Sequence, residues 1–239
     1  MYNSLTRLQN VFGFFTTVAF AIGALIAASD FAAPRTPSAS IKMTNVQVVK
    51  GRPHYYSTKK EEYAIIKFSL DADLSSLFTW NTKQLFVYVT AEWPAPPAGA
   101  DSMNQTNKAV IWDSIITSPS ADHLSNLGPV ALKKLRKSAA GKSIDPNRGK
   151  LSLKNQKPKY QITHPTGKIA ETDEVKLHVN YNVQPWVGIL TWNQNIDLGL
   201  WKKFGDGISK AFALPALKKK EGDDKGKKEG DDKGKKGGR

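Results

Sequence analysis

An uncharged apolar run from Val11 to Ser29 constrains this chain more than any other feature. Its nineteen residues, if helical, extend about 28 Å at about 1.5 Å each, close to the roughly 30 Å hydrocarbon core of a bilayer. The apolar region of a secretory signal peptide is shorter, about 7 to 15 residues. The run therefore predicts a helix that crosses a membrane and is retained as an anchor.

A cleaved signal peptide is the alternative interpretation of the same run. Ala27, Ala28 and Ser29 precede Asp30, and small residues in this arrangement fit a signal-peptide cleavage site. Small residues are also frequent in membrane-spanning helices, so they discriminate weakly between the two interpretations. The length of the run favours the anchor.

The charges beside the run predict its orientation. Arg7 and the terminal amine precede it, Asp30 follows directly, and the next cation is Arg35. Because positive charge is retained on the cytosolic side, we expect a cytosolic N-terminus. Everything after the anchor would then lie on the far side, in the lumen of the endoplasmic reticulum in a eukaryotic cell.

Beyond the anchor, apolar residues recur with a period of two, which is typical of half-buried β-strands. In residues 174–183, Val175, Leu177, Val179, Tyr181 and Val183 alternate with polar residues. The expected strands are 41–49, 63–71, 83–93, 108–116, 159–163, 174–183 and 187–192. Strands without an intervening long helix predict an all-β fold, an antiparallel β-sandwich-like lumenal domain behind a single transmembrane helix.

The chain divides by composition into an anchor, one domain and two basic segments. The net charge is +14, but residues 128–159 hold ten Lys or Arg against one acid, and the tail holds ten against six. The rest of the chain is nearly neutral, which argues against a nucleic-acid partner. The expected divisions are a cytosolic N-terminus 1–10, an anchor 11–29, a stalk 30–40, a lumenal domain 41–217 with a mobile basic insertion 128–158, and a disordered tail 218–239 that repeats KKEGDDKG.

Two further segments carry expectations of their own. The sequon Asn104-Gln105-Thr106, in a Pro-rich loop, predicts an N-glycan at Asn104 if this part is lumenal. Before the tail, Trp201, Phe204, Ile208 and Phe212 have roughly helical spacing, although nearby glycines and a proline disfavour a helix. That segment is either an interfacial membrane helix or a last strand with a packed loop, and we favour the second.

The sequence offers no recognisable catalytic or metal-binding constellation. It has no cysteine, no G-x-S-x-G motif, and only four scattered histidines, at positions 54, 123, 164 and 178. Neighbouring acids such as Asp71 and Asp73 have no third ligand at a known spacing. We therefore expect no cofactor, no metal and no enzymatic activity of the chain's own.

The stretch DLSSLFTWNTKQLFVYVTAE, residues 73–92, is the most specific motif. It resembles the hallmark of signal peptidase complex subunit 3, the 22/23 kDa accessory subunit family, and fungal members in particular. VIWDSII and YNVQPWVGIL agree with the family in order and spacing. The residues that match the pattern are Asp73, Phe78, Trp80, Asn81, Lys83, Gln84, Phe86, Tyr88, Glu92, Trp112, Asp113, Asn182 and Pro185.

The resemblance implies a non-catalytic accessory subunit in the endoplasmic reticulum membrane. Its lumenal domain would scaffold the catalytic serine protease subunit, beside other small subunits and membrane lipid, for removal of signal peptides from nascent secretory proteins. The matching residues are then candidate interface residues, although Trp80, Phe86 and Tyr88 could instead pack the domain's own core. The basic insertion and the tail are additions to the family pattern. The usual sequon before YNV is replaced by Glu174, so a glycan would have moved to Asn104.

Two other functions remain alternatives to the accessory subunit. The first is an independent membrane-tethered lumenal hydrolase, which would require catalytic groups that the motifs do not show. The second is a binding domain that acts through the basic residues 128–159, and its function would be lost when that segment is deleted.

Overall fold

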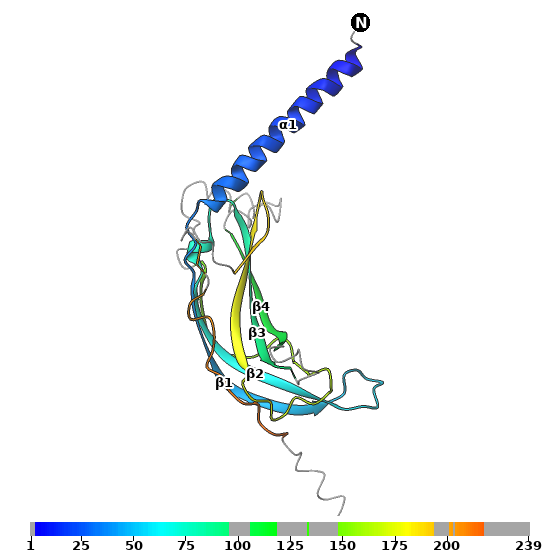
Figure 1. The fold of residues 1–239 in the computed structure, drawn as a ribbon, viewed down its shortest axis with the longest axis vertical. Coiled ribbons are helices and arrows are strands. Elements are labelled where there is room, and N and C mark those ends of the chain that lie inside the picture. Colours follow the sequence, from blue (N-terminus) through cyan, green and yellow to red (C-terminus); the bar gives the residue numbers. More distant parts are fainter. Residues whose placement is uncertain are drawn as a thin grey trace, which may run out of the picture.

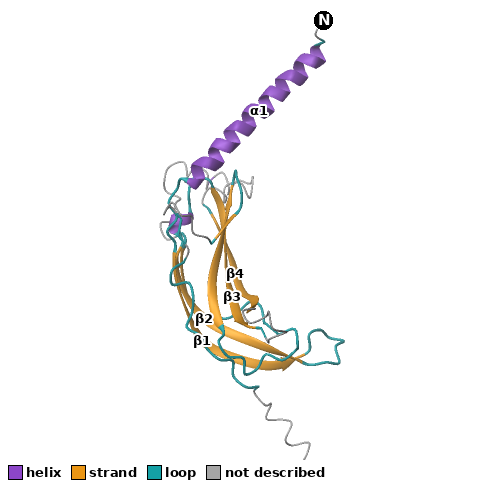
Figure 2. Cartoon of the chain, in the orientation of Figure 1, coloured by secondary structure: helices purple, strands orange, loops and turns teal. Residues whose placement is uncertain are grey.

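The computed structural model describes residues 3–95, 106–118, 133, 148–193, 201–202 and 204–217. One long helix, α1 (Ser4–Phe31), projects from one end of an elongated β-domain (Figure 1). Besides α1, the described part of the chain contains the short helical turn η1 (Ser75–Leu77). Strands and their connections form the rest, as Figure 2 shows. The predicted all-β class with a single transmembrane helix is confirmed.

Helix α1 has the properties that a lipid environment requires. It is long and apolar enough to cross a bilayer, and large side chains such as Phe12, Phe14 and Phe20 are exposed along it. Its hydroxyl groups bond within the helix: Thr16 and Thr17 donate to the carbonyl of Gly13 at 2.8 and 2.9 Å. No hydroxyl of this pair therefore needs water inside the membrane.

The domain consists of two antiparallel sheets. The first sheet has the order β1-β2-β5, formed by β1 (Ser38–Gly51), β2 (Glu61–Asp73) and β5 (Lys150–Gln156). The second has the order β4-β3-β6-β7, formed by β4 (Thr106–Thr117), β3 (Thr82–Pro94), β6 (Lys176–Pro185) and β7 (Thr191–Trp192). Neighbours in sequence are joined mainly as hairpins, which explains the antiparallel pairing.

The core lies between the two sheets and is built by the alternation seen in the sequence. Along β2, every second residue is buried, and β6 shows the same period. The inward-facing residues of these two strands include Ala64, Ile66, Phe68, Leu70, Leu177, Val179, Tyr181 and Val183. Trp112 of β4 reaches across to Phe68, with ring centroids 6.0 Å apart in an edge-on arrangement. Such pairs add to the burial energy of the core.

The segment 204–217 runs extended along the outer edge of β6. Val175 and Phe212 exchange two backbone hydrogen bonds of 2.9 Å, and the Val179 amide donates to the Gly207 carbonyl at 2.8 Å. The helix considered for this region is therefore wrong. The segment is an extended, packed loop that is joined to this edge by isolated bridges at Val175 and His178, and it does not form the regular last strand that was also expected. Pairing with β6 satisfies the backbone where the glycines and the proline disfavour a helix.

Three segments differ from the predictions. The stalk expected at 30–40 is packed, because Arg35 and Pro37 are buried and β1 already begins at Ser38. In the run expected as strand 187–192, only Thr191 and Trp192 are strand. The run 159–163 forms only a single bridge between Ile162 and Ala64. Local periodicity did not reveal these outcomes because they depend on contacts with residues far away in sequence.

The basic insertion is also shorter than expected. Within 128–158, the residues Lys150–Gln156 form β5 and pair with β2. Apart from Lys133, residues 119–147 lie outside the described part of the chain, as do Asn104 and the tail 218–239.

Candidate functional site

The residues that match the family pattern separate into three groups in space. One group lies on the outer face of the second sheet, a second lies at the end of the domain next to α1, and a third supports the fold. The structure thus brings most of the predicted residues to two surfaces.

The first group forms an aromatic and amide-rich surface, which we call the outer face. Its members are Gln84, Phe86, Tyr88 and Glu92 of β3, Asp113 and Ile115 of β4, and Asn180 and Asn182 of β6. They share one side of the sheet, because Phe86 pairs with Ile115 and Asn182, and Tyr88 pairs with Asp113 and Asn180. The rings of Phe86 and Tyr88 stack with centroids 5.4 Å apart. Both are partly exposed while their neighbours Leu85, Val87 and Val89 fill the core.

Charge is confined to the borders of the outer face. Glu92 forms an ion pair with Lys108 at 2.8 Å, and Nε2 of His178 lies 3.3 Å from the other carboxylate oxygen of Glu92. Burial lowers the pKa of His178; the Glu92 carboxylate opposes the shift, and Lys108 and Lys176 reinforce it. His178 is therefore neutral at pH 7, and Glu92 pairs mainly with Lys108. Asp113 pairs with Lys159 at 3.2 Å. The centre of the face is left uncharged.

The second group fixes a loop at the membrane end of the domain, Pro185–Leu190, which we call the apical loop. Asn81 is buried and clamps it: its side-chain amide donates to the Val187 carbonyl at 2.7 Å, and its side-chain oxygen accepts from the Val187 amide at 3.1 Å. Its backbone carbonyl accepts from the Trp186 amide at 2.8 Å. Lys83 lies over the Trp186 ring, 5.3 Å from its centroid. Trp80, beside the clamp, is 66% exposed.

A buried ion pair joins the end of α1 to the domain. Arg35 is 1% exposed and donates to the Asp30 carboxylate at 2.7 Å and to the Thr191 hydroxyl at 2.9 Å. The second oxygen of Asp30 accepts from the Thr79 hydroxyl at 2.8 Å. Four residues from three separate parts of the chain are therefore joined by hydrogen bonds. Removing one of them would leave a buried polar group without a partner.

Trp201 completes this junction, which we define as Asp30, Arg35, Thr79, Thr191 and Trp201. The Arg35 guanidinium lies 4.1 Å from the centroid of the Trp201 ring. Phe31, the last residue of α1, stacks on the same ring at 5.1 Å with an interplanar angle of 8°. The indole N–H donates to the Ala33 carbonyl at 3.2 Å. The helix is thus fixed to the domain directly, without a flexible linker.

The third group has structural roles. Asp73 caps the η1 turn by accepting from the Ser75 hydroxyl at 2.6 Å and from its amide at 3.0 Å, and these bonds lower the Asp73 pKa. Phe78 packs partly buried against the core beside Gly149. Trp112 lies inside the sandwich. These three residues support the fold. Core packing was the alternative considered for Trp80, Phe86 and Tyr88, but Trp80 is exposed and the other two are partly exposed.

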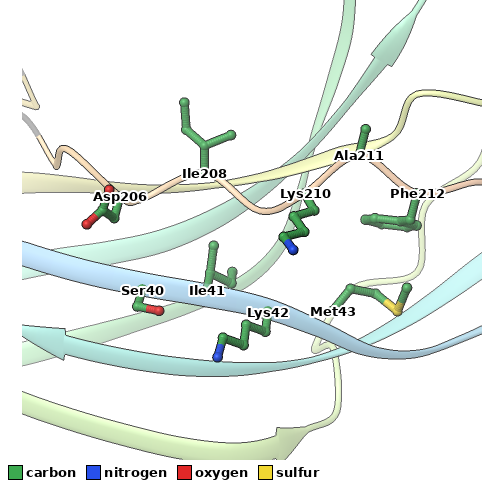
Figure 3. Close-up of a pocket in the computed structure, with 9 residues that line it drawn as sticks. All are labelled: Ser40, Ile41, Lys42, Met43, Asp206, Ile208, Lys210, Ala211 and Phe212. Carbon is green, nitrogen blue, oxygen red and sulfur yellow. The ribbon is translucent and has the colours of Figure 1, made fainter.

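Two of the described histidines have local hydrogen-bond or carboxylate partners. His164 bonds to Thr166, two residues away, at 2.7 Å within a tight turn, and His178 belongs to the Glu92 cluster. Among these residues no three His, Asp or Glu side chains gather at metal-binding distance. A cleft of about 600 Å³ lies between β1 and segment 206–212 (Figure 3). Its polar side chains are Ser40, Lys42, Asp206 and Lys210, with Ile41, Met43 and Phe212 as apolar walls. The cleft separates β1, the edge strand of the first sheet, from the segment that runs along β6 of the second sheet.

Comparison with known proteins identifies the family. The family model of the signal peptidase subunit matches residues 1–129 and 144–199, which include α1, both surfaces and most strands. The chain belongs to the signal peptidase subunit family.

Relatives from yeasts and from an amoeba carry the same name, signal peptidase complex subunit 3. The Debaryomyces hansenii protein is 30% identical over 219 residues, covering 88% of this chain and 97% of the relative. The Saccharomyces cerevisiae protein is 31% identical, covering 82% of this chain and 93% of the relative. The Dictyostelium discoideum protein is 34% identical over 63% of this chain and 68% of the relative. The protein is thus a signal peptidase subunit with one helix long and apolar enough to cross a membrane.

Sequence reasoning missed the junction. Asp30 was interpreted only as a flanking charge, and Arg35 as part of a spacer. Their partners Thr79, Thr191 and Trp201 lie 49 to 166 positions away from them in the chain, so no local pattern links them. The available signal was weak: one acid at the end of an apolar helix, followed five residues later by a single arginine in an otherwise uncharged segment.

Proposed function

We propose that the protein is a non-catalytic accessory subunit whose outer face binds the catalytic serine protease subunit of the complex. The observation that carries this proposal is the position of the family motif. Phe86, Tyr88 and Asn182 have no structural task on the inner side of the sheet, yet they match the family pattern and share one exposed surface. Partly exposed aromatic rings flanked by amides are typical of the centre of a protein interface.

The proposed mechanism is the positioning of another chain. The carboxylates of the outer face, Glu92 and Asp113, are paired with Lys108 and Lys159, so the face would act by holding the protease subunit in its active geometry. The junction makes this possible because a domain fixed to its membrane helix presents the outer face at a constant height and angle. Removal of signal peptides from nascent secretory proteins would then depend on this subunit through the stability and placement of its neighbour.

The proposal includes a topology. Within α1, Arg7 precedes the uncharged run 11–29 and Asp30 follows it, which supports a cytosolic N-terminus and a lumenal domain. An N-glycan at Asn104 would follow from that arrangement. Glycosidase treatment of the wild type should increase the gel mobility of the chain, and Asn104→Gln should abolish the change. A glycosidase-insensitive wild type would leave Asn104 unmodified and remove this support for the topology.

Affinity isolation in mild detergent tests the binding face. We expect the full chain to bring down a protease that cleaves signal peptides, and Tyr88→Glu to lose most of it because a carboxylate would be buried without a partner. Tyr63→Glu is the matched control, since Tyr63 is partly exposed on the outer side of the other sheet. If both variants lost the protease to the same extent, or if neither lost it, the assignment of the outer face would be contradicted.

A further inference from the structure

The apical loop rises beside the membrane helix. A Cβ placed on Gly188 would lie 3.3 Å from the Cβ of Ala27, and one placed on Gly23 would lie 3.8 Å from Cγ1 of Val187. In the last turns of α1, the covered positions are Gly23, Ile26, Ala27 and Asp30. Their spacing of three and four residues marks one face of a helix. The loop is therefore packed along that face.

The height of the loop follows from helix geometry. Gly23 lies six positions before Ser29, the last residue of the uncharged run, which corresponds to about 9 Å along the axis. The apolar run is just long enough to fill the hydrocarbon core, so its end marks the boundary of the bilayer. Val187 consequently lies about 9 Å on the membrane side of that boundary, within the depth of roughly 5 to 10 Å that interfacial segments reach.

The chemistry of the loop suits that depth. Residues 184–192, QPWVGILTW, contain no charge. Ile189 is 67% exposed, and Trp186, Val187 and Leu190 are each about 40% exposed. Water around so many apolar side chains is unfavourable, and exposed clusters of this kind mark binding surfaces. Trp80 and Trp192, exposed beside the loop, have the amphipathic rings that are enriched at membrane interfaces.

The polar groups near the loop are also compatible with lipid. The amides of Trp186 and Val187 and the carbonyl of Val187 are bonded to Asn81. These backbone groups therefore enter an apolar medium without losing a water partner. The Lys83 ammonium faces the Trp186 ring, 5.3 Å from its centroid. From this position the flexible lysine side chain can reach lipid phosphates.

We propose that the apical loop Pro185–Leu190 inserts into the lipid interface of the leaflet on the domain side, as a second membrane contact beside α1. Lipid is the occupant because the loop packs directly beside a helix that lipid already surrounds. With two contacts, the domain cannot rotate freely about the helix axis. This inference does not depend on the proposed function, since it concerns the isolated chain and a bilayer.

A depth measurement tests the insertion, and the absence of cysteine from the chain makes it direct. Ile189→Cys carries an environment-sensitive fluorophore, and the full chain is reconstituted in phosphatidylcholine vesicles with or without lipid that bears a quencher on its acyl chain. The matched control is Tyr56→Cys, because Tyr56 is 87% exposed and lies in the connection between β1 and β2, at the end of the domain far from α1 (Figure 1). Leu190→Cys is the second test position.

We expect blue-shifted emission and loss of about half of it to the lipid-bound quencher at positions 189 and 190. At position 56 we expect neither. If iodide in the aqueous phase quenched the fluorophores at positions 189 and 190 as strongly as the fluorophore at position 56, the proposal would be overturned. Shielding that appears only when other subunits are added would overturn it as well, in favour of a protein partner.

Discussion

At the scale of single residues, Gly188 shows how tightly the apical loop meets the helix. Its φ of +124° is a conformation that other residues rarely adopt, and its Cα faces Ala27 too closely for a further carbon to fit without displacement. Only glycine satisfies both requirements. The position therefore serves the packing of two elements.

Gly188→Ala should release the loop. Strain of about 1 to 3 kcal/mol is expected from the backbone conformation, so hydrogen exchange at the Trp186 and Val187 amides should accelerate about tenfold or more. Exchange measured on the full chain in detergent micelles checks this. Gly205→Ala is the control, because no atom lies within 4 Å of its would-be Cβ. Unchanged protection in Gly188→Ala would show that the loop accommodates the side chain.

Glu62 makes stability depend on acid pH. Its carboxylate is 8% exposed and accepts the amides of Ala170 at 3.0 Å and Ile169 at 2.9 Å, and these bonds lower its pKa. A lowered pKa in the folded state stabilises the fold above the ordinary value near 4.5, and this contribution is lost as the pH falls through the folded-state pKa.

Glu62→Gln should therefore cost about 1 kcal/mol at pH 7 and flatten the decline of the melting temperature between pH 6 and pH 3. Thermal melts of the full chain in detergent measure both effects. Glu171→Gln, at an exposed carboxylate, should change neither. A variant at 62 with the same acid profile as the wild type would refute this role.

At the scale of elements, the junction determines whether the helix and the domain move as one body. Its ion pair is almost fully buried. Each charged group has lost its contacts with water, and the opposite charge of its partner compensates for that loss. Local patterns could predict the helix and the long strands, because their periods of 3.6 and 2 are written in neighbouring residues. They could not predict that Arg35 is buried, since Asp30 and Trp201 cover it only after the chain has folded.

The costs of removing the two members of the pair should not be additive. Arg35→Ala alone is expected to cost about 3 kcal/mol or more, because Asp30 then stays buried without a partner. Asp30→Ala combined with Arg35→Ala should cost less than the sum of the two single variants. Melting temperatures in detergent give this cycle, and Lys108→Ala, at an exposed pair with Glu92, should cost below about 1 kcal/mol. Additive single effects would contradict the coupling.

The sequence could predict most of the residues that belong to the outer face, but it could not predict that they lie together on one surface. The family pattern supplied Phe86, Tyr88 and Asn182, yet strands β3 and β6 are about a hundred residues apart in sequence and meet only through the pairing register. The same pattern contained Asp73 and Trp112, which support the fold instead. The apolar run 187–192 was misread because hydrophobicity alone does not distinguish a buried strand from an exposed apolar loop.

At the scale of the whole molecule, the architecture is a membrane helix rigidly attached to a sandwich that presents one aromatic face. The family model omits residues 130–143, and the described chain resumes at Arg148, just before β5. The omitted segment carries five Lys or Arg and no acid. It is an addition to the part of the chain that the family model matches.

Deleting residues 130–143 should therefore leave complex assembly and signal-peptide cleavage within about twofold of the wild type, since no described strand is interrupted. Affinity isolation from microsomes, followed by cleavage of a model precursor, measures both. Loss of the protease subunit in this deletion would instead support the electrostatic binding domain considered from the sequence.

The most direct test of the central claim is photo-cross-linking from the outer face in intact endoplasmic reticulum membranes. A photo-activatable phenylalanine analogue replaces Phe86 in one chain and Tyr63 in another. The account predicts that position 86 cross-links to the catalytic protease subunit and that position 63 does not. Cross-links to that subunit from position 63 alone, or from neither position, would contradict it.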